Sequence, residues 1–154
     1  MGYQGFSKIE IAEILTHLNR LLASYQVHFN TLRGFHWAIE GQDYFDLSRA
    51  FKELYEKALL DTNEIAKRIR LFDQKPVHLM QGYLKLSAIE ENGLELTGFE
   101  MIKLSLKNIN ELLSLQRDCI NKASEIGDYG TEQMVKNFTY ELEKDQLRLT
   151  SWLK

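Results

Sequence analysis

The side chains most able to bind a metal or move a proton are the four histidines, His17, His28, His36 and His78. None of them belongs to a His-Glu-x-x-His or Glu-x-x-His motif, and the sequence has no Cys-x-x-Cys pair. The absence of Glu-x-x-His argues against a di-iron centre inside a helical bundle, which usually needs two such motifs. Glycine-rich phosphate-binding motifs are also absent. The sequence therefore excludes the most recognisable helical metal motifs and leaves less familiar arrangements open.

The most distinctive stretch surrounds His36, which lies between Phe35 and Trp37. Residues 32–45 read LRGFHWAIEGQDYF, and the pattern continues through a phenylalanine- and leucine-rich segment to the sequence EIAKRI at 64–69. An imidazole flanked by two aromatic side chains suits either a ligand position or a packed, hydrogen-bonded histidine. The residues alone leave both roles open.

The elements that position this stretch are predicted to be helices. Apolar residues recur three and four apart over 7–39, 43–72, 97–126 and from 128 or 131 to the end. Ser7 and Glu10 have the spacing of a capping box, and Gly127 is a good helix stop. A short helix is expected within 77–87, followed by a loop over 88–96. Four long helices with a long connection between the second and third are typical of an all-α, ferritin-like four-helix bundle.

Composition narrows the class of protein. The 154 residues suit one domain over 1–154, and the single Pro76 favours long helices. No apolar run is long enough to span a membrane, and no secretory leader is recognisable. The single Cys119 cannot form an internal disulfide and fits a reducing compartment, so we expect a cytoplasmic protein. A net charge of −3 argues against a generally basic nucleic-acid surface.

The ordered set of motifs resembles the Dps family of mini-ferritins over nearly the whole chain. The resemblance rests on Phe-His-Trp at 35–37, Gly41, Phe45 with Leu47, the Phe-x-x-Leu-Tyr segment at 51–55, and EIAKRI at 64–69. Further matches are LNRLLA at 18–23, YLKLS at 83–87 and GDYGT at 127–131. The resemblance implies a ferritin-like bundle that assembles into a hollow homo-oligomeric shell, expected to be a dodecamer, with a role in iron storage or stress protection.

In the Dps family a ferroxidase site between two subunits draws on five positions, and the resemblance places them on this chain. The histidine of Phe-His-Trp is His36 and is kept. The other four positions are substituted, and here they hold Ser48, Lys52, Asn63 and Lys67. Two of the family's carboxylates are thus replaced by ammonium groups. Iron is therefore not expected at the standard site, and no residue is assigned a catalytic role.

Helix geometry explains how these positions work together. At about 100° per residue, positions 48, 52, 63 and 67 fall within an arc of about 100°. Positions 52 and 63 are nevertheless roughly 16 Å apart along the helix axis. One chain cannot close a small site with both pairs, whereas two antiparallel copies of the second helix can. The pattern predicts a twofold interface at this face.

The substituted positions favour structural roles. Iron(II) prefers carboxylate and imidazole ligands, and a lysine ammonium offers none. We expect Lys52 and Lys67 to form ion pairs, with Glu53, Glu56 or Glu64 as partners. An active ferroxidase with displaced ligands remains an alternative, and its candidate ligands are His36 with Glu40, Asp43, Glu56 or Glu64. A third alternative is a non-catalytic helical scaffold that keeps only the fold.

The resemblance also places an acidic threefold pore at the start of the last helix. Asp128 and Glu132 lie there, with Glu125 close by. The alternative for Asp128 is plain helix capping, which an aspartate provides in any protein. DNA binding is expected to be weak or absent, because only Lys8 precedes the established first helix and the sequence lacks a lysine-rich segment.

Overall fold

All regular structure in the part of the chain that the computed structural model describes, residues 3–92 and 95–154, is helical. The long helices are α1 (Lys8–Ala38), α2 (Tyr44–Leu71), α4 (Gly98–Ile126) and α5 (Tyr129–Leu153). A short 3-10 turn, Tyr3–Gly5, precedes α1, and the short helix α3 (Met80–Leu86) lies between α2 and α4. The predicted all-α bundle with a small helix in its long connection is confirmed.

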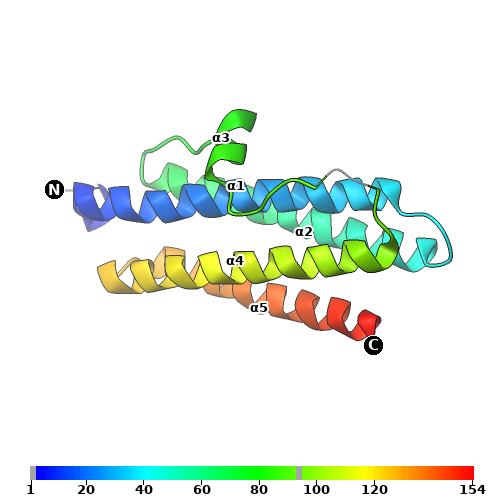
Figure 1. Ribbon diagram of the computed structural model, residues 1–154. Coiled ribbons are helices and arrows are strands. Elements are labelled where there is room, and N and C mark those ends of the chain that lie inside the picture. Colours follow the sequence, from blue (N-terminus) through cyan, green and yellow to red (C-terminus); the bar gives the residue numbers. More distant parts are fainter. Residues whose placement is uncertain (1–2, 93–94) are drawn as a thin grey trace.

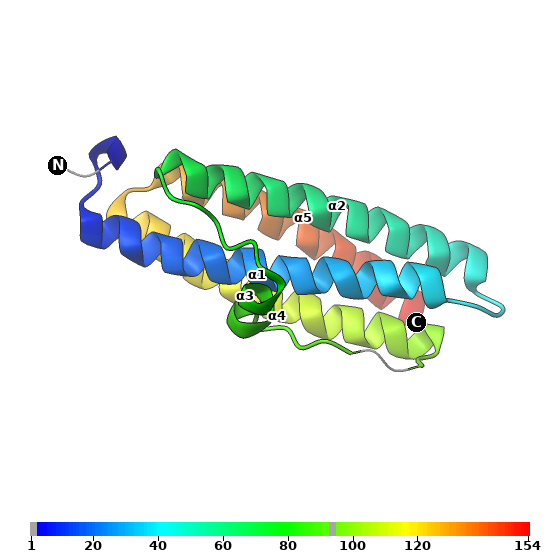
Figure 2. The same ribbon diagram turned by 90° about the horizontal axis from the view of Figure 1, so that it is seen from above.

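The connection from α2 to α4 runs back along the bundle, as Figure 1 shows. Helices α1 and α2 are antiparallel, and so are α4 and α5 (Figures 1 and 2). Because the long connection returns to the end where α2 began, α2 and α4 run in the same direction (Figures 1 and 2). The short helix α3 packs on the outside of α1 rather than inside the bundle. Helix α2 lies along an outer edge of the bundle, on a side that α3 does not cover (Figure 2).

Local sequence sets the helix ends. The Ser7 side chain accepts a hydrogen bond from the backbone N–H of Glu10, and the Glu10 carboxylate accepts one from the backbone N–H of Ser7, at 3.1 and 2.9 Å. This is the predicted capping box. Gly127 ends α4 with φ 76°, a left-handed conformation that a side chain at this position would strain. The predicted stop is confirmed.

The core is one apolar cluster that all four long helices share. Its largest fully buried members include Tyr25 on α1 and Phe51 on α2. The Cys119 thiol is free and buried in the same core, and burial raises its pKa to about 12. It is therefore a packing residue without a reactive thiolate.

The connection between α2 and α4 departs in part from the sequence predictions. The short helix is narrower than the predicted 77–87, because residues 77–79 and 87 are not helical. In the predicted loop over 88–96, residues 93 and 94 lie outside the described residues, as do residues 1 and 2. No described helix combines the length and the apolar character needed to cross a membrane.

Candidate functional site

His36 lies in the last turn of α1 and faces the first turns of α2. Its Nδ1 is 2.8 Å from the backbone carbonyl oxygen of Ser48 and 3.2 Å from the Ser48 hydroxyl. Because a carbonyl oxygen can only accept, Nδ1 carries the proton and donates a hydrogen bond to the backbone carbonyl oxygen of Ser48. The other ring nitrogen, Nε2, keeps its lone pair while the imidazole is neutral. His36 is therefore oriented in the way that metal-binding histidines often are, by a backbone carbonyl on the far nitrogen.

The His36 ring packs against Tyr55, which belongs to a small group of stacked aromatic side chains. The Tyr55 ring lies with its centroid 5.6 Å from that of His36, and Phe29 packs edge-on against Tyr55. The Arg33 guanidinium stacks on both Phe29 and Trp37, at 4.8 Å from each ring centroid. The exposed fraction of the Trp37 side chain is 70%. The hydrogen-bonded, packed role predicted for His36 is thus present in the single chain.

The remaining substituted positions do not gather around His36. Lys52, Asn63 and Lys67 are all exposed on α2. Lys67 pairs with Glu64 at 3.5 Å, which is one of the predicted ion pairs. No pair is found for Lys52 within the described residues, and its predicted partner Glu53 instead pairs with Arg148 of α5 at 2.7 Å. A single chain therefore presents His36 of α1 beside the first turns of α2 and separate cations along the face of α2.

The four carboxylates that could serve as displaced ligands are exposed: Glu40, Asp43, Glu56 and Glu64. Across residues 3–92 and 95–154, no three histidine, cysteine, aspartate or glutamate side chains converge in a way that could hold a metal ion. The single chain thus provides no iron site of its own in the described residues.

At the predicted pore, Asp128 has a structural role. Its side chain is 1% exposed, accepts the N–H of Thr131 at 3.1 Å as the α5 cap, and pairs with Arg68 at 2.6 Å. Arg68 also donates to the Thr131 hydroxyl and passes so close to Gly130 that a Cβ there would lie 2.6 Å from the guanidinium. The capping role predicted as the alternative is confirmed, and pore lining by Asp128 stays a prediction.

Glu132, the other predicted pore residue, is partly buried and pairs with Lys136 on the next turn of α5 at 3.6 Å. Glu125 is exposed and pairs with Lys122 at 3.2 Å. Both carboxylates are thus engaged with lysines of their own helices, and their position relative to a pore depends on assembly.

A second polar cluster, not predicted from the sequence, lies between α2 and α5. The Lys57 ammonium contacts both carboxylate oxygens of Asp145 at 2.9 Å and Glu141 at 3.5 Å. Asp61 lies beside them, and burial together with the nearby Asp145 raises its pKa to about 7 against the pull of Lys57. Burial raises the pKa of Asp145 as well. Lys57 thus contacts two carboxylates beside Asp61, and Glu141 also pairs with Lys144 at 2.8 Å.

His28 lines the same small cavity of about 20 Å³ and is fully buried. Its Nδ1 has no hydrogen-bond partner within the described residues, and burial lowers its pKa to about 4, so the ring is neutral at physiological pH. The neighbouring Tyr25 hydroxyl accepts a hydrogen bond from Gln116 of α4 at 2.6 Å. Only the Lys57–Asp61 spacing was visible in the sequence, because the other members come from distant helices.

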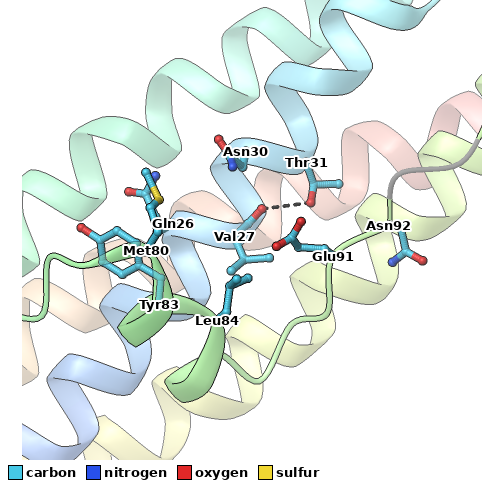
Figure 3. Close-up of a pocket in the computed structure, with 9 residues that line it drawn as sticks. All are labelled: Gln26, Val27, Asn30, Thr31, Met80, Tyr83, Leu84, Glu91 and Asn92. Carbon is cyan, nitrogen blue, oxygen red and sulfur yellow. Dashed lines mark hydrogen bonds between the residues drawn. The ribbon is translucent and has the colours of Figure 1, made fainter.

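A shallow cavity of about 220 Å³ lies where α3 packs on α1 (Figure 3). The Thr31 hydroxyl at its wall donates to the backbone carbonyl of Val27, so it is turned toward its own helix (Figure 3). Glu91 is the one charged residue in its lining. This combination gives no indication of a specific ligand.

Known proteins share this arrangement of helices. The profile of the Ferritin-like domain matches residues 15–154. A Dps protein from Vibrio cholerae, described as one of the ferritin-like diiron-carboxylate proteins, superposes with a TM-score of 0.94 and 35% identity over 97% of this chain and 94% of that one. "DNA protection during starvation protein 2" of Bacillus anthracis is 30% identical over 92% of this chain and 97% of its own length. An uncharacterized Haemophilus influenzae protein is 34% identical over 91% of this chain and 88% of its own.

The profile covers most of the sequence, so the chain belongs to the ferritin-like family. The Vibrio cholerae Dps structure shares the fold of this chain over nearly its whole length. Within that family the chain is a Dps-type mini-ferritin.

Proposed function

We propose that this mini-ferritin forms a hollow dodecameric shell of one domain per chain, and that its standard inter-subunit site does not oxidise iron. The observation that carries this proposal is the charge at the family's ligand positions. Lys52 and Lys67 are exposed cations on α2, and Asn63 offers only an amide oxygen. Iron(II) as substrate would meet one imidazole, from His36, and no carboxylate among the five positions.

The size of the effect follows from Coulomb's law. At an effective dielectric constant near 20, a unit charge at about 4 Å contributes roughly 4 kcal/mol. Replacing a carboxylate by an ammonium turns this attraction for a cation into repulsion. Each lysine therefore weakens the binding of a dication by more than roughly 4 kcal/mol relative to the family's carboxylate. One imidazole cannot compensate for two such reversals. The residues present therefore do not fit iron at the standard position.

The shell would act in iron storage or stress protection by another route. Iron could enter through pores that Glu132 helps to line, or active relatives could co-assemble with this chain. Twelve copies of a chain with net charge −3 carry about −36 charges, which repels DNA phosphates at moderate salt. We expect no retardation of DNA on a gel at physiological salt and neutral pH without divalent metal.

Two measurements on the purified protein test the proposal. Light scattering in dilute buffer should give the mass of a dodecamer, and a monomer or simple dimer would contradict the shell. Iron(II) oxidation with peroxide should run little faster than in buffer. If oxidation is fast and disappears in His36→Ala, an active site with displaced ligands replaces the inactive-site proposal.

Restoring the family's ligands provides the complementary test. The restored variant carries Ser48→His, Lys52→Asp, Asn63→Asp and Lys67→Glu. It should form the same shell and oxidise iron(II) with peroxide well above the unmodified protein. A matched variant changes Lys52 and Lys67 to neutral Gln, which removes the positive charges without adding metal ligands. Its rate of iron(II) oxidation should stay near background.

A further inference from the structure

The outer face of α2 carries a stripe of four cations in an otherwise acidic chain. Arg49, Lys52, Lys67 and Arg70 are all exposed. At about 100° per residue they fall within an arc of about 60°. Glu56 is the one carboxylate in that arc. We name these four cations the α2 stripe.

The α2 stripe is symmetric about the centre of the helix. Arg49 and Arg70 are equally far from the midpoint between Leu59 and Leu60, and so are Lys52 and Lys67. The two leucines at this midpoint are 41% and 64% exposed, so they present an apolar contact at the centre of the α2 stripe. Two antiparallel copies that meet through the leucines would therefore place Lys52 beside the partner's Lys67 and Arg49 beside the partner's Arg70.

Few groups in the single chain neutralise the α2 stripe. Lys67 has Glu64 at 3.5 Å, and Arg70 donates to the backbone carbonyl of Gln74 at 3.1 Å. No carboxylate pairs with Arg49 or Lys52 within the described residues. Facing cations of two copies would repel one another across the interface. The pairing therefore needs a negative charge that the chain does not supply in sufficient number.

We propose that each meeting point of two α2 stripes binds a tetrahedral oxyanion of the phosphate class, one per chain. This inference rests on the proposed shell, because the site is incomplete without a second copy. The donors are the Lys52 ammonium, the guanidinium of Arg49, and the partner's Lys67 and Arg70. The partner's Asn63 adds a neutral amide donor one turn away. Arginine forks match tetrahedral oxyanions in a bidentate way, and lysines add point charges.

The proposed oxyanion site lies inside the interface between two chains, so it differs from an open surface that could bind nucleic acid. Free phosphate is small enough to occupy a closed contact between two helices, whereas a duplex is not. The bound oxyanion would replace repulsion by attraction and thereby stabilise the pair. Phosphate should consequently raise the apparent melting temperature, because it binds the assembled state and not the unfolded chain.

The experiment is calorimetric titration of inorganic phosphate into the assembled, extensively dialysed protein, with chloride at matched ionic strength as the comparison. We expect saturable binding that approaches one phosphate per chain. Lys52→Gln and Lys67→Gln should each bind about 10-fold more weakly or worse, because each loses a charge-assisted hydrogen bond. Lys107→Gln, an exposed lysine on α4, is the matched control and should bind normally. Lys67→Arg should retain binding.

Light scattering of every variant separates the possible failures. A full shell that binds phosphate no better than chloride overturns the oxyanion site and leaves the proposed shell standing. A monomer that does not bind phosphate overturns both. Equal weakening in the control variant shows nonspecific attraction and overturns the site. A 30-base-pair duplex that displaces bound phosphate would show an outward-facing stripe and would also overturn it.

Discussion

Asp61 makes the stability of this bundle depend on pH. Its folded-state pKa is about 7, while the ordinary value is 3.8. The carboxyl is protonated in both states below pH 4 and ionised in both above pH 7. A raised folded pKa means that the folded state binds the proton more tightly, so this group removes stability as the pH rises from about 4 to 7. We therefore expect Asp61→Asn, which cannot ionise, to be more stable than the unmodified protein at pH 8.

The size of the gain follows from the shift. A difference of about 3 pKa units corresponds to roughly 4 kcal/mol, and residual solvent contact reduces this to about 2–4 kcal/mol. For a chain of this length that range equals a rise of about 5–15 °C in melting temperature. The gain should vanish near pH 4, where Asp61 is neutral in both states.

The assay is thermal unfolding of both proteins between pH 4 and 8, at one protein concentration because assembly affects the melting temperature. Asp118→Asn, which removes an exposed carboxylate from α4, is the matched control and should change stability by less than about 0.5 kcal/mol at every pH. An Asp61→Asn gain that is absent at pH 8, or that is equally large at pH 4, would refute the reasoning.

Three further predictions concern buried groups and a helix end. Burial lowers the pKa of His28 from 6.5 to about 4, so the free energy of unfolding falls by about 3 kcal/mol as the pH drops from 6.5 to 4. His28→Gln should remove this pH-dependent loss in thermal melts. Asp128→Asn leaves the Arg68 guanidinium, 17% exposed, facing a neutral amide oxygen in place of a carboxylate. It should cost about 3–5 kcal/mol in urea unfolding, whereas Glu125→Gln should cost less than about 1 kcal/mol. Gly127→Ala places a side chain at φ 76° and should cost about 1–2 kcal/mol, again by urea unfolding.

The sequence by itself determined the helices and their ends. Capping by Ser7 and Glu10 and termination at Gly127 depend on residues within one turn, so the local pattern was sufficient to predict them. The order of motifs also identified the Dps-type class, and with it the substituted ligand positions. These features are encoded by near neighbours or by residue type alone.

The tertiary structure decided which charged groups meet. Arg68 and Asp128 are 60 residues apart, and Lys57 and Asp145 are 88 apart. Their pairing depends on the rotation and register of whole helices, which no local pattern fixes. The same packing buries His28 and Asp61 and shifts their pKa values, because desolvation is set by neighbours from several helices. A sequence shows that these groups exist, and only the assembled bundle gives each one its partner and its charge.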